Sequence, residues 1–244
     1  MRAKPNRKPF FRFIKCIVRW FVPRPKWQYV GEKPTSPCIY ISNHSAVSGP
    51  ATYELYFPEN MRIWGTYEMC GNFRSRWRYL DQIYFHQKKK RTKFTSFFLA
   101  TILSPILAMF YKGMRIIPSY PDHRLLETMK TSIAELEKDV SILIFPENSS
   151  DGYHEVLTEF YGGFWTLAKR YYTQTGKDIQ IVNMYYHRKT RRVIVGEPKS
   201  YLALSERLTG KEDVLQFFLE ETNRLYRKYI LGEADEVLAP QKSA

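Results

Sequence analysis

The sequence predicts a single α/β domain in which helices flank a mixed, mostly parallel sheet. Two short apolar runs, residues 38–41 and 142–145, each end in polar residues, as buried strands do at one edge of a sheet. Before the second run, the order strand, helix, strand with short joints is typical of a right-handed parallel crossover. A chain of 244 residues suits one such domain and is too short for two comfortable ones.

The remaining elements follow from periodicity and turn residues. Residues 10–22 place apolar side chains at helical spacing, with Arg12, Lys15 and Arg19 elsewhere, which predicts a short amphipathic helix. This helix either lies on an anionic membrane surface or packs against its own domain. We divide the chain into this basic N-terminal segment with its membrane-surface helix (1–27), the α/β domain (28–203) and a C-terminal helix with its tail (204–244). The expected strands are 27–31, 38–41, 61–66, 113–118, 140–145, 179–186 and 192–195, and the further helices are 51–57, 124–138, 164–172 and 211–229.

The charge of the chain indicates partners that carry phosphate. The net charge is +14, and aromatic residues make up 16% of the sequence. Basic and aromatic residues interleave both on single-strand nucleic-acid binders and on proteins at membrane surfaces. No recognition helix, zinc finger or ribonucleoprotein pattern is present. We therefore expect an anionic membrane surface as partner and no nucleic acid, with a basic nucleic-acid binder as the rejected class.

Cysteine usage and the N-terminus indicate the compartment. Cys16, Cys38 and Cys70 are odd in number and lack metal-ligand spacing, which favours a reduced, intracellular environment. The basic N-terminus lacks a small-residue cleavage site, so no signal peptide is expected. Together with the charge, this predicts a peripheral or monotopic protein on the cytoplasmic face of the cell membrane.

Residues 94–111 form 18 residues without a charge, flanked by Lys93 and Lys112 and interrupted by Pro105. The length lies at the lower limit for a membrane span. A buried hairpin, a span and a re-entrant segment are the three interpretations. We reject the span, because a crossing would separate the two halves of the expected pocket. A helix pair that packs in the core or enters one leaflet remains.

His44 and Glu147 follow the two apolar runs and would face one pocket if those strands are parallel neighbours. A histidine at a strand end can also have a purely structural role. The sequence contains no Gly-x-Ser-x-Gly elbow, no cluster with metal-ligand spacing and no glycine-rich phosphate loop. Serine-hydrolase chemistry, a bound metal and a nucleotide cofactor are therefore not expected.

The two runs resemble motifs of the glycerolipid acyltransferase superfamily, typified by 1-acylglycerol-3-phosphate acyltransferases. Ile41-Ser42-Asn43-His44 is similar to the first motif, Asn-His-x4-Asp, and Phe145-Pro146-Glu147 to the third, Phe-Pro-Glu-Gly-Thr-Arg. The resemblance continues through Asp151-Gly152, Phe160, Gly163-Phe164 and Val195-Gly196-Glu197-Pro198. It covers about residues 28–200 in the family's order.

The resemblance implies transfer of a fatty acyl group from acyl carrier protein or acyl-coenzyme A to a lysophospholipid or a related lipid hydroxyl. His44 would act as general base, because a glycerol hydroxyl is a poor nucleophile near neutral pH. Glu147 would be the second catalytic residue. No cofactor beyond the thioester co-substrate is implied. The residues expected to bind substrate are Asn43, Ser45, Arg115, Pro146, Asn148, Ser149 and Ser150. Arg115 and Arg124 are the two candidates for the arginine of the family's second motif.

The sequence also departs from the family pattern. Gly49 stands where the first motif has its aspartate, and Asn148-Ser149-Ser150 replaces Gly-Thr-Arg. In a catalytic triad, loss of the orienting carboxylate lowers turnover by about four orders of magnitude. Glu147, Glu54 or Asp151 would have to take over that role. The alternative is a non-catalytic, acyltransferase-like protein that binds lipid or a membrane.

Overall fold

The structure, a computed structural model, describes residues 9–35, 37–45, 48–149 and 152–234. Its centre is a seven-stranded sheet in the order β1-β7-β6-β2-β5-β3-β4. Neighbouring strands are parallel except β6 and β7, which are antiparallel. The predicted α/β fold with a mixed, mostly parallel sheet is confirmed. The strands are β1 (Lys26–Tyr29), β2 (Cys38–Ser42), β3 (Met61–Thr66), β4 (Ile117–Ser119), β5 (Ser141–Ile144), β6 (Gln180–His187) and β7 (Arg192–Ser200).

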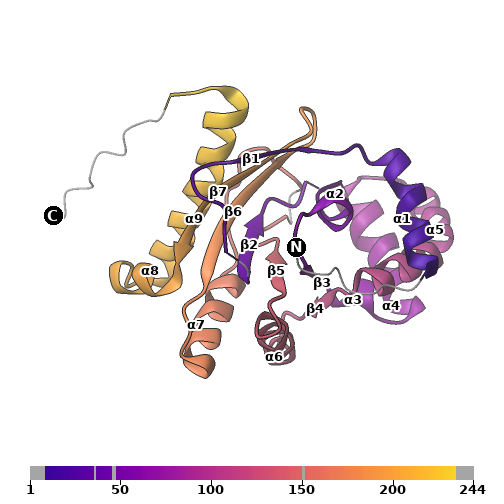
Figure 1. The fold of residues 1–244 in the computed structure, drawn as a ribbon. Coiled ribbons are helices and arrows are strands. Elements are labelled where there is room, and N and C mark those ends of the chain that lie inside the picture. Colours follow the sequence, from indigo (N-terminus) through magenta and orange to yellow (C-terminus); the bar gives the residue numbers. More distant parts are fainter. Residues whose placement is uncertain (1–8, 36, 46–47, 150–151, 235–244) are drawn as a thin grey trace.

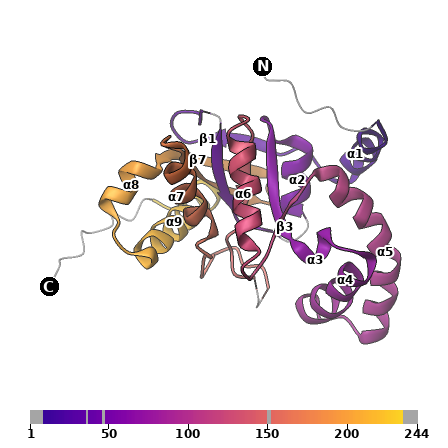
Figure 2. The same ribbon diagram turned by 90° about the horizontal axis from the view of Figure 1, so that it is seen from below.

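Helices cover both faces of the sheet. Figure 1 shows α7, α8 and α9 together at one end and α1 beside α5 at the other, and Figure 2 shows α6 lying across the middle strands. The helical segments are α1 (Pro9–Phe21), α2 (Ser48–Tyr56), α3 (Tyr67–Cys70), α4 (Phe73–Arg78), η1 (Tyr79–Lys88, π-helical), α5 (Lys93–Met114), α6 (Leu125–Leu136), α7 (Gly163–Thr175), α8 (Tyr201–Arg207), α9 (Lys211–Tyr226) and η2 (Arg227–Leu231, π-helical).

The core divides into two layers because alternate side chains of a strand point to opposite faces. Ile39 and Ile142 lie in one layer with residues of α6, α7 and α9, including Phe218. Tyr40 and Leu143, one position along the same strands, lie in the other layer, which includes residues of α1 and α2. All three residues at the middle of β2 are buried, as expected for a central strand of a parallel sheet.

The expectation of a helix pair at residues 94–111 is wrong. These residues belong to one helix, α5, which runs from Lys93 to Met114 with Pro105 inside it. The predicted strand 113–118 is correspondingly shorter and begins at Ile117. Gly113 lies in α5 next to Phe11 of α1: a Cβ on residue 113 would lie 2.0 Å from that ring, so the site has no room for a side chain.

Helix α5 is only partly covered by the rest of the protein. Among the described residues it is the one helix long and apolar enough to cross a membrane by length and composition, and 17% of its apolar window is buried. With α1 it forms a surface of exposed large side chains, which we call the α1–α5 patch. The patch consists of Phe13, Ile17, Trp20 and Phe21 of α1 and Phe94, Phe97, Phe98, Ile102, Ile106 and Met109 of α5.

Candidate functional site

The sheet brings His44 and Glu147 together. Strands β2 and β5 pair in parallel, with Ile41 opposite Ile144, so the residues after both strands meet at one edge. The backbone N–H of His44 donates to Oε2 of Glu147 at 2.8 Å. Glu147 is buried, with 8% of its surface exposed. The prediction that these two strands are parallel neighbours is confirmed, and with it the contact between their polar ends.

The imidazole of His44 lies between two aromatic rings. The centroid of Phe145 is 4.9 Å away with the planes tilted by 57°, and that of Tyr153 is 5.1 Å away with the planes nearly parallel, at 25°. His44 is half-buried. Burial raises the pKa of Tyr153 well above its ordinary value, with Tyr79 and Tyr84 contributing. Its hydroxyl therefore stays protonated at neutral pH.

Asn43, predicted to bind substrate, connects two strands. Its Nδ2 donates to the carbonyl of Tyr186 at 3.0 Å, and its Oδ1 accepts from the N–H of the same residue at 2.8 Å. Ser42, which contacts the hydroxyl of Tyr53 at 2.7 Å, also donates to Oδ1. The buried amide thus extends the pairing of β2 and β6 by one residue and fixes the backbone immediately before His44.

The turn after His44 has no room for the family's aspartate. Ser45 adopts a left-handed conformation with φ of 46°, and its carbonyl accepts a hydrogen bond from Ser48 Oγ at 2.7 Å. A Cβ on residue 49 would lie 2.2 Å from the His44 carbonyl oxygen, far inside contact distance. Gly49 is therefore required by this backbone, and a carboxylate cannot be added there without moving the turn.

Two of the carboxylates considered as replacements for that aspartate are located by the structure. Glu54 lies on α2, where its Oε1 pairs with Lys15 Nζ of α1 at 2.8 Å, so its carboxylate joins two helices. Glu147 contacts His44 through the backbone bond described above. Asp151 lies outside the described residues, as does Ser150.

The rest of the predicted acceptor pocket lies next to Glu147. Pro146 is buried, and its carbonyl accepts from the N–H of Tyr161 at 2.7 Å. Asn148 donates from Nδ2 to Glu159 Oε2 at 2.6 Å. The carbonyl of Ser149 accepts from the N–H of Gly152 at 3.3 Å. These contacts fold the segment after β5 back on itself.

Arg115 does not join this group. Strand β4 pairs with β3 so that Trp64 lies opposite Ile117. By the same register, Arg115 lies opposite Arg62, at the N-terminal end of β3. The Nε of Arg62 donates to the Arg115 carbonyl at 2.7 Å. Through β5, Arg62 is level with Ile39, five residues before His44, or about 16 Å along the strand. The expected role of Arg115 in the acceptor pocket is not supported by this register.

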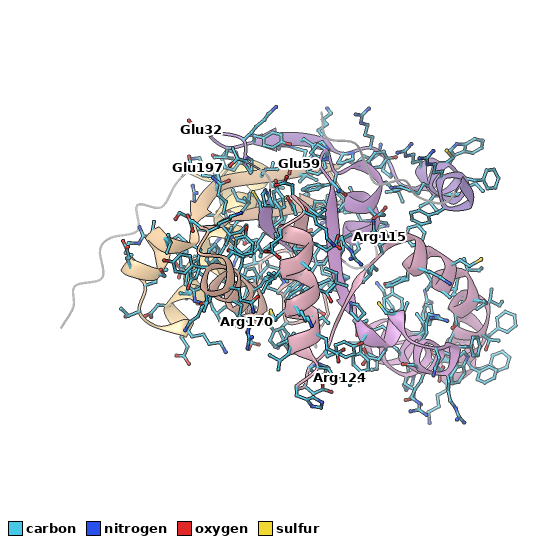
Figure 3. The ribbon with its side chains drawn as sticks, turned by 60° about the horizontal axis from the view of Figure 1, so that its bottom comes forward. Glu32, Glu59, Arg115, Arg124, Arg170 and Glu197 are labelled. Carbon is cyan, nitrogen blue, oxygen red and sulfur yellow. The ribbon has the colours of Figure 1, made fainter. Side chains whose placement is uncertain are left out.

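A different arginine lies past the other end of β4. Arg124 stacks against Tyr67 and Tyr120, at 5.1 and 4.5 Å from their ring centroids, and pairs with Asp122 at 2.7 Å. The side-chain and backbone hydrogen bonds from Arg124 lower the pKa of Asp122 to about 2. Figure 3 shows Arg124 well apart from Arg115, near the start of α6. Because β4 is parallel to β2, the end of β4 that precedes Arg124 lies at the same edge of the sheet as the end of β2 that precedes His44.

The segment 152–160, of which the resemblance included only Gly152 and Phe160 at its two ends, crosses the sheet edge from β5 to β6. Past Tyr153, the carbonyl of Glu155 accepts from the hydroxyl of Tyr185 at 2.6 Å. Its carboxylate accepts from Lys189 at 2.8 Å and from the hydroxyl of Tyr226 at 2.7 Å. We call residues 152–160 the strap. No periodicity marks the residues between its ends, and their partners Tyr185, Asn223 and Tyr226 are far away in the sequence.

Comparison with known proteins gives one structural likeness and no family. No protein-family model and no curated protein matches the sequence. The fold is similar to the crystal structure of PlsC, the 1-acyl-sn-glycerophosphate (LPA) acyltransferase from Thermotoga maritima, at 9% identity and a TM-score of 0.49. The similarity covers 93% of this chain and 80% of that one. At this identity and score, the likeness assigns neither a family nor an activity to the chain.

The described residues contain no group of three or more His, Cys, Asp or Glu side chains that could hold a metal ion. Cys16, Cys38 and Cys70 are free thiols. Burial raises the pKa of Cys38 to about 12 and that of Cys70 to about 11, with smaller contributions from their charged neighbours. Neither thiol is therefore an ionised nucleophile near neutral pH.

Proposed function

We propose that this protein is an acyltransferase that moves a fatty acyl group from an acyl carrier protein or coenzyme A thioester to a lysophospholipid or related lipid hydroxyl. One observation carries the proposal: His44, at the end of β2, contacts Glu147 of the Phe145-Pro146-Glu147 corner of β5. These two segments, about a hundred residues apart, are the ones that resemble the acyltransferase motifs. Their meeting supports a shared site.

In the proposed reaction, His44 is the general base. A ring nitrogen removes the proton of the acceptor hydroxyl as its oxygen attacks the thioester carbonyl carbon. A carbon–oxygen bond forms, the carbon–sulfur bond breaks, and the imidazolium returns its proton to the departing thiolate. The reaction is an exchange of ester for thioester and consumes no further reagent. The imidazole is half-buried, so the protein partly shelters it from water.

Glu147 and Asn43 are positioning residues in this proposal. Each holds the backbone on one side of His44, through the His44 N–H and the Tyr186 peptide respectively. Arg124, which lies past the end of β4 with Tyr67 and Tyr120, takes the place that we expected for Arg115 as a contact for the acceptor headgroup. Its Nε and Nη2 donate to Oδ1 and Oδ2 of Asp122 respectively, and the guanidinium can exchange this carboxylate for a phosphate bound in the same bidentate geometry.

The α1–α5 patch is the proposed contact with an anionic membrane. Exposed apolar patches of this kind on a soluble surface mark interaction sites. The two helices share an apolar groove of about 410 Å³, which is lined by residues of both, including Ile17 and Ile106. Exposed basic residues border the patch, and they complement anionic headgroups. They are Arg12, Arg19, Lys89, Lys90, Arg91, Lys93 and Lys112.

The packing of α5 favours insertion along the surface over a crossing. One side of the helix is covered by α4 and η1. Arg76 of α4 is buried there and donates to the carbonyl of Ser104 at 2.9 Å and to that of Gly71 at 2.9 Å. A crossing helix would carry Arg76 and the charged surface of α4 into the hydrocarbon, where a charge costs about 3 kcal/mol or more. A helix lying in one leaflet keeps both near water.

The test is mass spectrometry of lipid products after the purified full chain, bound to vesicles, receives mixed lysolipids and acyl thioesters. We expect a new acylated lipid, and a loss of about 100- to 10,000-fold in its rate with His44→Ala. His86→Ala changes an exposed histidine on η1 and serves as the matched control. Unchanged transfer by His44→Ala would show that the assigned base is wrong.

The second candidate function is that of a non-catalytic protein that binds lipid or a membrane. Gly49, which leaves no space for the family's aspartate, is the observation that favours it. This candidate predicts that the wild-type chain binds lysolipid-containing vesicles but forms no acylated product with any donor. The same experiment therefore distinguishes the two functions.

A further inference from the structure

A histidine that acts as base needs a fixed ring orientation and a means of stabilising the cation it becomes. In a catalytic triad, a carboxylate on the far side of the ring does both. Gly49 cannot supply that carboxylate, because any Cβ at this position meets the His44 carbonyl oxygen. Glu54 is engaged with Lys15 at the α1 interface. The structure offers a different neighbour for the ring.

That neighbour is the face of Tyr153. The two rings are 5.1 Å apart and nearly parallel, so the π face of the phenol covers the imidazole. The face of an aromatic ring carries partial negative charge and attracts a cation within about 6 Å of its centroid. Phe145 contacts the imidazole as well, at 4.9 Å and a steeper angle. Together the two rings restrict rotation of the imidazole.

We infer that Tyr153 is a positioning residue for His44, whose stacked ring orients the imidazole and stabilises its protonated form. The inference rests on the proposed function for its catalytic meaning and on the stacking geometry for its physical content. Tyr153 acts through its ring face, because the face is the part of the side chain that lies against the imidazole.

The strap holds Tyr153 in this place from both sides. Before the tyrosine, Glu147 forms an antiparallel bridge with Phe160, and Asn148 bonds Glu159. After the tyrosine, the carboxylate of Glu155 accepts hydrogen bonds from Tyr226 at the end of α9 and from Lys189 in the turn that follows β6. The backbone N–H of Leu157 also donates to Asn223 of α9 at 2.8 Å. Because these contacts hold the chain on both sides of Tyr153, its ring can restrain the imidazole of His44.

Simple packing is the competing explanation, and it predicts a different response. If Tyr153 only shields the imidazole from water, its removal lets water solvate the cation, and the pKa of His44 rises. If the ring face stabilises the cation, removal lowers that pKa. The direction of the shift therefore separates the two roles.

The experiment is NMR titration of the full chain in detergent micelles with 13C-labelled histidine, and His44→Gln assigns the signal. We expect Tyr153→Leu to lower the pKa of His44 by about half a unit and Tyr153→Phe to leave it unchanged. Tyr161→Leu, at an exposed tyrosine just beyond the strap, is the matched control and should change nothing. An unchanged or raised pKa in Tyr153→Leu overturns the inference.

A second variant covers the case in which Tyr153→Leu does not fold. Tyr153→Trp presents a ring face that binds cations more strongly, and we expect it to raise the pKa of His44 above the wild-type value. A lowered value contradicts the inference. The NMR readout needs no activity, so failure of the proposed function leaves it intact. If the chain is active, the acidic limb of its kcat/KM profile should shift with the same pKa.

Discussion

Gly49 lies so close to His44 that a Cβ on residue 49 would approach the His44 carbonyl oxygen to 2.2 Å. The departure from the acyltransferase motif is therefore built into the backbone of this turn. Substitution of one residue cannot restore the motif, because the start of α2 would have to move away from the strand end first.

Gly49→Asp should consequently weaken the protein and not activate it. We expect a loss of about 1–3 kcal/mol in the free energy of unfolding, as for other overpacked sites. Urea unfolding measures this loss in Gly49→Asp. Gly49→Ala and Gly71→Ala then provide a matched comparison of one added Cβ at each glycine. A Cβ on residue 71 would make only ordinary contacts, of 3.4 Å, and that variant should keep wild-type stability. A stable Gly49→Asp chain with faster acyl transfer would contradict this account of the turn.

Asn43→Ala should reduce stability, because the side chain connects β2 to β6. Both peptide groups of Tyr186 that it contacts are buried, and each costs about 1–3 kcal/mol when left without a partner. We therefore expect a loss of at least about 2 kcal/mol in urea unfolding. Asn148→Ala, at the exposed bond to Glu159, is the control and should lose less. A raised KM at unchanged stability would instead support the predicted substrate-binding role of Asn43.

The double variant Phe98→Glu with Ile106→Glu should bind membranes poorly. Both side chains are more than half exposed on the α1–α5 patch, and burying each in lipid contributes about 1.5–3 kcal/mol. We expect a more than tenfold loss of affinity for phosphatidylglycerol-containing vesicles in a sedimentation assay. Leu126→Glu, an exposed leucine of α6 outside the patch, is the control. Equal loss in that control would exclude the patch as the binding surface.

Acid should weaken the anchor of the strap. The hydrogen bonds from Lys189 and then Tyr226 lower the pKa of Glu155 from 4.5 to about 2. The carboxylate therefore stabilises the fold fully above about pH 4.5, and this contribution is lost as the pH falls toward about 2.

Glu155→Gln should lower the melting temperature at neutral pH by about 1–3 °C, as for an exposed ion pair. The difference from wild type should shrink as the pH falls from 4.5 to about 2, in thermal unfolding followed by circular dichroism. The exposed Glu206→Gln is the control. A difference that stays constant across this pH range would show that ionisation of Glu155 does not stabilise the strap.

Much of the sheet is predictable from the sequence because burial leaves a local pattern. Strand β3 begins and ends at the predicted residues, 61 and 66, and β1 is an edge strand as expected. The end of α5 is not predictable in the same way. Residues 113–116 could continue a helix or begin a strand, and the packing of Phe11, a hundred residues earlier, against Gly113 leaves no local pattern in the sequence.

The surroundings of the apolar stretch 94–111 are likewise not predictable from the local sequence. Its composition fits a core helix and a surface helix equally well, since hydropathy does not say what covers a side chain. Only the packing of α4 and η1 against one side leaves Phe98 and Ile106 exposed on the other. The expectation of a helix pair was wrong because Pro105 was taken as a break, while α5 continues through it.

By itself, the sequence determined which segments become buried strands and that His44 and Glu147 follow two of them. The tertiary structure decided what surrounds them: Gly49 without room for a side chain, Tyr153 against the imidazole, and Arg115 at the far end of the sheet. The physical reason is how far apart along the chain the interacting groups are. Strand patterns arise from neighbours along the chain, whereas the register of strands and the stacking of rings depend on groups that meet only when the chain has folded.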